Sequence, residues 1–315
     1  METGPSIGVI GSLNRAESRA VMEEAARRGA GAMLFDLSKD EVLDTLDLSG
    51  GRLLDRPLEG FAGWYVNTMG NRAPRFRREA ADSEAEWEAA GPLYHEYVGT
   101  ENRRYERRAS LLMALEKMAP VVNPLDTYRW HATKVFELHA LAQAGFRVPE
   151  FVSSNDPEAL KAFIRSCGGR ALYKPHVGGT MCATLVDAAV IGEVAPSLRL
   201  RPVLLQRFIP GFNIRAYVAG DRFVGAARIL QDEAVADSRV APEGVEVWDL
   251  PEAERRTALD AARHHGLAFS GIDFQYHAGE NRYYLLEANS SPMFVNFERL
   301  TGVGVTEALV RLLLP

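Results

Sequence analysis

Two acidic residues and an amide near the end of the chain have the types and the spacing of a metal site. Asp273 lies in the run SGIDFQYH, and Glu287 and Asn289 lie in RYYLLEANSSP. The segment AGENR between the two runs has a length that suits a β-hairpin loop. If His277 pairs with Tyr283, the two carboxylates stand directly opposite each other. Asn289 then projects from the same face, because side chains alternate along a strand.

Two facing carboxylates repel each other and need a compensating positive charge. Hard oxygen ligands favour Mg²⁺ or Mn²⁺ over zinc, and Mg²⁺ usually completes its shell with water and phosphate oxygens. A slip of one residue in the register would put the acids on opposite faces and remove the site. Spacing alone leaves two alternatives open: a carboxylic acid pair that shares a proton, or a sheet surface with Lys or Arg partners.

Two lysines could supply the other half of a nucleotide site. Lys174 ends the apolar run ALYK, just ahead of a turn that contains Gly178 and Gly179. A lysine in this position can reach phosphate oxygens while the N–H groups of the turn face the anion. Lys134 lies earlier, in the helical pattern WHATKVFEL. Either lysine alone fits a surface position, but together with the acidic residues they indicate bound nucleotide.

The order of these motifs resembles the ATP-grasp superfamily. The resemblance rests on Lys134, on Lys174-Pro175 with its two following glycines, and on LLQRFIPGFNIRAYV, GIDF and LLEANSSP. Within the superfamily the chain is similar to RimK-type glutamate ligases and, more closely, to the microviridin-type (graspetide) peptide macrocyclases. The resemblance covers residues 121–315 well and residues 1–120 only in layout.

The resemblance implies a role for each matching position around ATP. Lys134 and Lys174 match the lysines that contact the phosphates, next to Gly178 and Gly179. The strand that meets adenine matches Gln206, Arg207, Phe208 and Ile209, and Asn213 matches a residue that faces the ribose. Two positions depart from the family pattern, because Arg207 replaces a residue that is usually acidic and Asn213 replaces a frequent Asp.

The resemblance also implies the residues around the reacting atoms. Asp273, Glu287 and Asn289 match the magnesium ligands, and two ions are expected. Three arginines match or lie near positions that face the γ-phosphate and the acyl phosphate: Arg215, Arg228 and Arg239.

The implied activity is that of an ATP-dependent carboxylate–amine or carboxylate–hydroxyl ligase with an acyl-phosphate intermediate. Its expected substrate is a carboxylate-bearing small molecule or a peptide, either an amino acid or peptide tail or a ribosomal precursor peptide. A non-catalytic ATP-binding regulatory module and a small-molecule kinase are the alternatives from other functional classes. No Ser-His-Asp or Cys-His pattern suggests a covalent nucleophile.

The elements that carry these residues follow from apolar runs and helical periodicity. Apolar runs at Ile7–Ile10 and Ala32–Phe35 flank a helical stretch and predict a βαβ unit with a parallel sheet. Helices are expected over Tyr128–Ala144, from Asp156, and over 251–265. Hairpins are expected around Gly220-Asp221 and over 269–289.

The predicted fold class is α/β (α+β), with the ATP-grasp fold that the resemblance implies. Three domains are expected. Residues 1–121 would form an N-terminal α/β domain with a parallel sheet, and residues 122–205 a small α+β lid. Residues 206–315 would form a C-terminal antiparallel sheet with helices and the metal site.

Composition limits the function further. The 315 residues are 47% hydrophobic and 25% charged, as in a globular protein, and the net charge of −6 argues against general nucleic-acid binding. Two cysteines, the absence of a signal peptide and the absence of a run of about 20 apolar residues predict a cytoplasmic protein outside the membrane. A homodimer is the assembly considered.

A charged region precedes the resembling part of the chain. It carries arginine clusters at 72–78 and 103–108, with acidic residues between them. A solvated helical face is the preferred interpretation, and a dock for an acidic or carboxylate-bearing substrate is the alternative.

Overall fold

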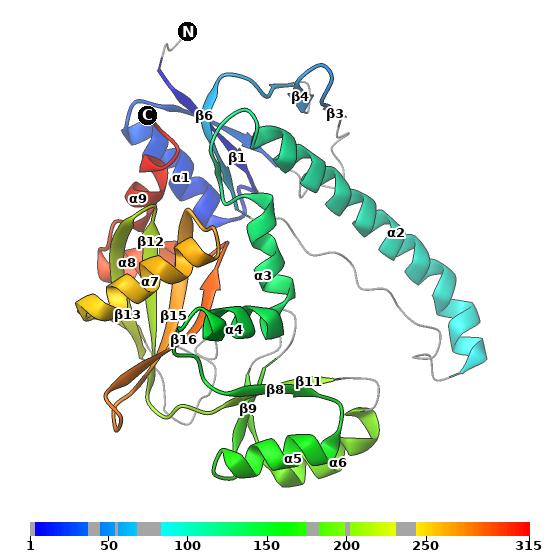
Figure 1. Ribbon diagram of the computed structural model, residues 1–315. Helices are drawn as coiled ribbons and strands as arrows, with labels where there is room; N and C mark the ends of the chain where they lie inside the picture. Colours follow the sequence, from blue (N-terminus) through cyan, green and yellow to red (C-terminus); the bar gives the residue numbers. More distant parts are fainter. Residues whose placement is uncertain are drawn as a thin grey trace. The chain divides into compact units, whose positions relative to one another are not determined.

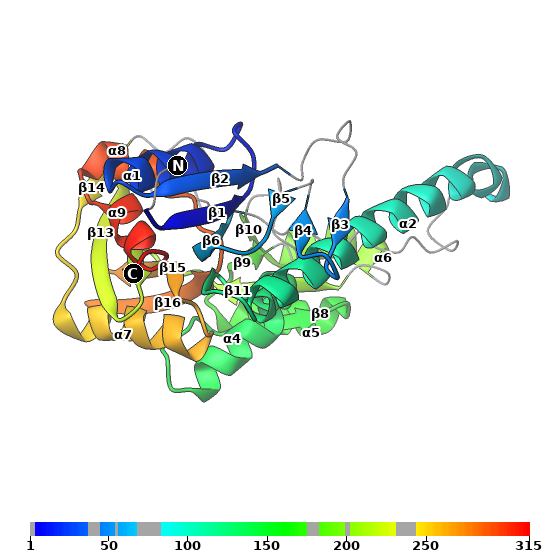
Figure 2. The ribbon, with the colours of Figure 1, turned by 90° about the horizontal axis from the view of Figure 1, so that it is seen from above.

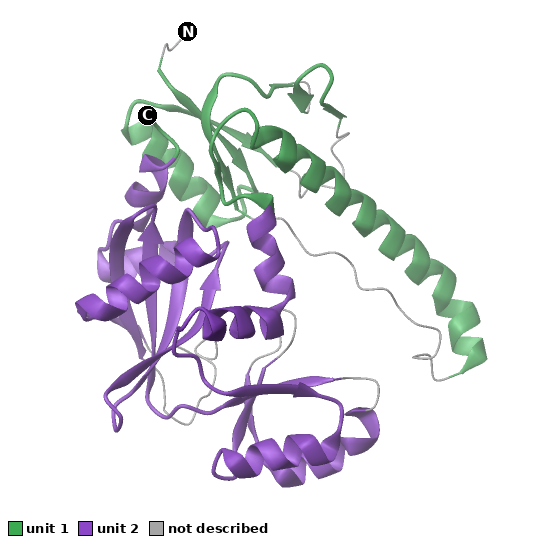
Figure 3. Ribbon diagram, viewed as in Figure 1, with its two compact units in different colours: residues 1–125, 313–315 green, residues 126–312 purple. Residues whose placement is uncertain are grey.

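The computed structural model describes residues 4–36, 45–53, 56–67, 83–174, 183–198, 202–230 and 244–315. The chain divides into two compact units (Figure 3). The first comprises Met1–Leu125 with Leu313–Pro315, and the second comprises Asp126–Leu312. No helix in the described ranges has both the length and the apolar character needed to cross a membrane.

The first unit contains the predicted βαβ element. Strand β1 (Ser6–Ile10), helix α1 (Ala16–Arg27) and strand β2 (Gly31–Phe35) follow one another, and β1 and β2 pair in parallel. Strand β6 (Phe61–Val66) pairs in parallel with β1, and β7 (Val121–Val122) pairs in parallel with β6. The sheet order is β2-β1-β6-β7. Short strands β3 (Leu46–Asp47), β4 (Arg52–Leu53) and β5 (Arg56–Pro57) form a separate antiparallel sheet.

A long helix, α2 (Glu84–Leu115), also belongs to this unit (Figure 1). Ser83 caps its start by accepting a hydrogen bond from the backbone N–H of Glu86 at 3.1 Å. Most of its side chains contact solvent, and the arginines of the 103–108 cluster are exposed or half-buried on it. This is the helical face expected there, whereas the cluster at 72–78 lies outside the described residues.

The second unit begins with a helical region that differs from the prediction. A single helix over Tyr128–Ala144 is wrong: the 3₁₀ helix η2 (Leu125–Tyr128), α3 (Arg129–Ala132) and α4 (Lys134–Gln143) replace it. The break falls at Thr133, whose φ of −133° and ψ of 48° are not helical. Lys134 is therefore the first residue of α4 rather than a residue in the middle of a helix.

A small α+β layer follows in the second unit. Strands β8 (Phe151–Ser154), β9 (Ala171–Lys174), β10 (Thr184–Val186) and β11 (Val203–Arg207) form a sheet in the order β10-β9-β11-β8. Helices α5 (Pro157–Ser166) and α6 (Ala188–Leu198) lie side by side on it (Figure 1). Asp156 caps α5 as predicted, with its carboxylate 3.0 Å from the backbone nitrogen of Glu158. Strand β11 runs across the predicted boundary at residue 205.

The rest of the second unit is built on a five-stranded antiparallel sheet in the order β14-β13-β12-β15-β16. Its strands are β12 (Phe212–Ala219), β13 (Arg222–Leu230), β14 (Gly244–Val247), β15 (Phe269–His277) and β16 (Arg282–Asn289). Helix α7 (Glu252–His264) packs on one face together with α4, and α8 (Val295–Thr301) packs on the other (Figure 2). Helix α9 (Val305–Arg311) ends the unit.

Candidate active site

The β15–β16 hairpin places Asp273 directly opposite Glu287, as predicted, but by a different route. At the turn His277 pairs with Arg282, one residue away from the expected partner Tyr283. The register then shifts between Phe274 and Asp273, and the shift skips Leu286. This β-bulge restores the predicted pairing. The assumed turn was wrong, and the carboxylate pair that was derived from it is confirmed.

Asn289 completes a cluster with the two carboxylates. Its amide nitrogen lies 3.0 Å from Asp273 Oδ2 and 3.2 Å from Glu287 Oε1. The three side chains therefore converge from the two strands of one hairpin, with the polar atoms in contact.

Two cations compensate the acids. Lys134, at the start of α4, places its Nζ 2.7 Å from Glu287 Oε2. Arg215 stands opposite Asp273 in the β12–β15 pairing and donates to both of its carboxylate oxygens, with a distance of 2.9 Å from Nη2 to Oδ2. The four charged side chains are between 15 and 30% exposed, so water screens these pairs only in part.

The two carboxylates differ in their readiness to ionise. Burial and the nearby Glu287 raise the pKa of Asp273 to about 6, against the attraction of Arg215. Burial also opposes the charge on Glu287, but Lys134, Lys174 and Arg215 outweigh it and hold the pKa of Glu287 below its usual range. Lys134 stays charged because its pairing with Glu287 overcomes the effect of burial on its pKa.

The donor set fits a hard cation. In the described ranges no group of three or more His, Cys, Asp or Glu side chains is placed to hold a metal. The candidate set consists of two carboxylates and one amide, whose polar atoms are in contact. Such oxygen ligands suit Mg²⁺ or Mn²⁺. The amide nitrogen of Asn289 now faces the acids, and a half-turn of the amide would present its oxygen instead.

Lys174 is the last residue of β9. Its positive charge contributes to lowering the pKa of Glu287. The glycines predicted to adjoin it, Gly178 and Gly179, lie outside the described residues, as does Arg239.

The segment predicted to meet adenine begins in β11. Gln206 is almost fully buried on this strand. Phe208 and Ile209 follow it, and the Ile209 carbonyl accepts a hydrogen bond from Gln275 Nε2 at 3.0 Å. Asn213 on β12 stands opposite Gln275 on β15. It lies two residues before Arg215 and therefore projects from the same face of the sheet as Arg215. The segment thus leads from the small sheet to the acidic cluster.

Comparison with known proteins identifies this arrangement. A family model described as the RimK-like ATP-grasp domain matches residues 132–313, more than half of the chain. The chain belongs to the RimK-like ATP-grasp family. The matched region contains every predicted site residue, and the predicted α/β ATP-grasp fold is confirmed.

Relatives and solved structures extend the comparison. The chain is 30% identical over 182 residues to the "Probable alpha-L-glutamate ligase" of Shewanella loihica, and 27% identical over 186 residues to the same-named protein of Vibrio atlanticus. These matches cover 55–56% of the chain, and they span about three fifths of each relative. A structure of the ATP-grasp ligase PsnB, complexed with a phosphomimetic variant of minimal precursor, Mg and ADP, covers 98% of the chain with a TM-score of 0.81 and 27% identity, over 97% of its own length.

A second structure shows the fold alone. The macrocyclase MdnC of Microcystis aeruginosa, bound with precursor peptide MdnA, has a TM-score of 0.74 at 17% identity. It covers 98% of this chain and 99% of its own.

Arg207 departs from the ATP-grasp pattern, and its contacts show what the substitution does. Its guanidinium lies 2.5 Å from Glu150 Oε2 and donates to the hydroxyl of Tyr284 at 2.8 Å. That hydroxyl donates in turn to Glu280 at 2.6 Å. Arg207 therefore links β11 to the hairpin that carries the acidic cluster.

The structure does not bring Arg228 together with the other arginine of the site. Arg228 stands opposite Ile214 on β12, so it projects from the face opposite to that of Arg215. There its guanidinium lies over the ring of Phe212, 4.0 Å from the centroid. Arg215 and Arg228 lie on different strands, so their spacing along the chain does not predict whether they share a face of the sheet.

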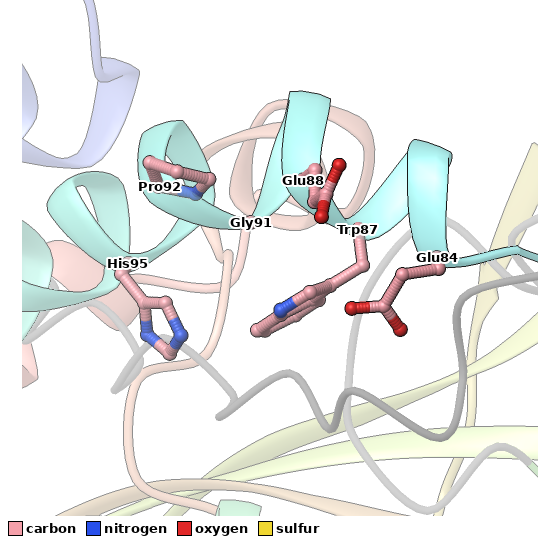
Figure 4. A pocket seen from close by; sticks show the side chains of 6 residues that line it. All are labelled: Glu84, Trp87, Glu88, Gly91, Pro92 and His95. Carbon is pink, nitrogen blue, oxygen red and sulfur yellow. The ribbon is translucent and has the colours of Figure 1, made fainter.

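A cavity of about 350 Å³ lies on α2, in the other compact unit (Figure 4). Glu84, Trp87, Glu88, Gly91, Pro92 and His95 line it. The indole of Trp87 packs against Gly91, where a Cβ atom would lie 3.1 Å from the ring. None of the predicted site residues lines this cavity.

Proposed function

We propose that this protein is an ATP-dependent ligase that joins a carboxylate to an amine or hydroxyl group through an acyl phosphate. The observation that carries the proposal is the convergence of Asp273, Glu287 and Asn289 with two cations, inside a RimK-like ATP-grasp domain. A structure with this donor set and these cations has the charges needed to hold a metal–triphosphate complex.

The reaction would proceed in two steps. A carboxylate oxygen of the substrate attacks the γ-phosphorus of ATP, the bond to ADP breaks, and an acyl phosphate forms. An amine or hydroxyl then attacks the acyl carbon, loses its proton and expels phosphate. Lys134 and Lys174 would hold the phosphate oxygens, and Arg215 would face the transferred phosphoryl group. Mg²⁺, held by Asp273, Glu287 and Asn289, would supply charge neutralisation for these anions.

A peptide is the substrate class we propose. The similar PsnB structure is complexed with a variant of minimal precursor, and the MdnC structure is bound with precursor peptide MdnA. The basic cluster at 103–108 on α2 offers positive charge that an acidic peptide could use. Extension of an amino acid or peptide tail is the second substrate considered, in keeping with the names of the glutamate ligase relatives.

We also propose two metal ions per site and a homodimeric assembly. Manganese titration with bound ADP would count the ions, and analytical ultracentrifugation would determine the assembly.

The first test is ADP release with Mg²⁺ and ATP, in the presence and absence of peptides rich in Glu, Asp, Thr, Ser and Lys. Ligation predicts ADP release that depends on the peptide, together with a product that has lost water by mass spectrometry. A stable phosphorylated product would indicate a kinase instead. A non-catalytic ATP-binding module would bind ATP but release no ADP with any acceptor.

A further inference from the structure

A buried carboxylate outside the acidic cluster has no role in the proposed chemistry. Glu137 lies on α4 and is 4% exposed, and the neighbouring His265, just after α7, is 3% exposed. Burial of a charged group without partners is costly, so the contacts of Glu137 indicate what it does.

Glu137 contacts the backbone between two of the predicted metal ligands. Its Oε1 accepts a hydrogen bond from the N–H of Ala288 at 3.2 Å. Ala288 lies between Glu287 and Asn289 on β16. Ala288 is bonded directly to Glu287 on one side and to Asn289 on the other. Because of these bonds, a fixed orientation of the Ala288 N–H restricts the backbone of both neighbours.

The position of β16 in its sheet explains why such a contact is needed. Among the described strands, β16 is the last in the sheet order, so no strand of that set pairs with its outward N–H groups. The outward N–H of Leu285 donates to the carbonyl of Arg147 at 2.8 Å. Ala288, beyond the bulge at Leu286, donates to Glu137 instead.

Helix α4 holds this segment at two consecutive residues. Lys134 and Glu137 are three positions apart and therefore lie on the same face of the helix. Lys134 pairs with the side chain of Glu287, and Glu137 binds the backbone of the next residue. The ion pair between Lys134 and Glu287 can break when a metal or phosphate binds, whereas the hydrogen bond from the Ala288 N–H to Glu137 can remain.

His265 lies beside Glu137. Its Nε2 is 3.4 Å from Glu137 Oε1, outside hydrogen-bond geometry. The imidazole stacks on Trp130 with 4.0 Å between ring centroids, and the indole N–H of Trp130 donates to the His265 carbonyl at 3.2 Å. The Glu137 carboxylate is therefore buried beside His265, which in turn contacts Trp130.

We propose that Glu137 is a positioning residue that holds the Glu287–Asn289 segment in the geometry that binds the metal. The metal role of that segment rests on the proposed function, whereas the hold on the Ala288 amide does not. Groups that orient metal ligands typically change metal affinity by about 10–100-fold when they are removed.

The test compares two substitutions that separate length from charge. Glu137→Gln keeps the length and an oxygen acceptor but loses the charge, and Glu137→Asp keeps the charge but withdraws the carboxylate from Ala288. Binding of Mn²⁺ in the presence of ADP is measured by calorimetry, and hydrogen exchange reports on the Ala288 amide. Gln143→Ala, at an exposed position of the same helix, is the matched control.

Positioning predicts that Glu137→Gln and the control bind Mn²⁺ nearly as the wild type does. Glu137→Asp should bind about tenfold more weakly and exchange the Ala288 amide faster. Equal binding by Glu137→Asp and the wild type, or weak binding by Glu137→Gln alone, would overturn the inference. If the wild type itself binds no Mn²⁺, the proposed function fails, and the exchange of the Ala288 amide in the two variants still decides the positioning role. Thermal melting establishes that each variant is folded.

Discussion

Asp273 stands directly opposite Glu287 only because the register of the hairpin shifts at Leu286. Without the shift, the pairing of His277 with Arg282 at the turn would place Asp273 opposite Leu286 instead of Glu287. The bulge therefore decides which side chains share the face of the candidate metal site.

Deletion of Leu286 should leave metal binding largely intact. With the extra residue removed, Glu287 follows Leu285 in regular register and still stands opposite Asp273. Deletion of Ala288 instead moves Asn289 to the other face of the strand and should weaken Mn²⁺ binding in the presence of ADP by about tenfold or more. Calorimetric titration of both variants checks this, after circular dichroism has established that both are folded. Equal binding by the two variants would show that the face of Asn289 does not matter for the site.

Substitution of the facing acids should separate activity from folding. Asp273→Asn and Glu287→Gln are each expected to reduce ADP formation by about 100-fold or more, since each removes a ligand from the proposed metal site. The matched control is Asp260→Asn, at an exposed position of α7. Steady-state ADP release at saturating ATP is the measurement. Retention of activity in either site variant would place the metal elsewhere.

Removal of Lys134 should make stability depend more strongly on magnesium. In Lys134→Met, Glu287 loses the positive charge that lies 2.7 Å away. The loss of this partner of a partly buried carboxylate should lower the free energy of unfolding by about 1–2 kcal/mol. Added Mg²⁺ would replace that charge and recover most of the loss. Thermal melting with and without Mg²⁺ and ADP tests the difference. A Mg²⁺ effect equal to that of the wild type would contradict the pairing.

Metal affinity should depend on pH through Asp273. A metal binds the ionised carboxylate, and the pKa of Asp273 is raised to about 6, so protons compete with the metal below that pH. The affinity for Mn²⁺ is expected to be constant above pH 6 and to fall by up to about tenfold per pH unit below it. Glu287 contributes no such change, because nearby cations hold its pKa low. Titrations of the wild type at several pH values test this, and the control Asp260→Asn should show the same dependence. An affinity that stays constant down to about pH 4.5 would indicate an ordinary aspartate.

The sequence was sufficient for the main elements because their signals are local. The apolar runs around Ile7 and Ala32 predicted the parallel βαβ unit, and the apolar and aromatic runs on either side of AGENR predicted the second hairpin. The facing carboxylates could be derived for the same reason, since a hairpin brings together residues that are close in sequence.

The features that the sequence did not reveal depend on contacts between distant segments. The helical pattern continues through Thr133, and only the structure shows that α4 begins at Lys134 and directs it to Glu287. The faces of Arg215 and Arg228 depend on the registers of three strands. Glu137 had no local signal, because its partners Ala288 and His265 lie more than a hundred residues away.

The most direct measurement of the central claim follows one oxygen atom. A substrate peptide whose carboxylates carry a heavy oxygen isotope is incubated with the protein, Mg²⁺ and ATP, and the phosphate that is released is analysed by mass spectrometry. Ligation through an acyl phosphate predicts that the label passes from the carboxylate to phosphate in step with ADP and product, in the wild type and not in Asp273→Asn. Unlabelled phosphate accompanying product formation would contradict the account.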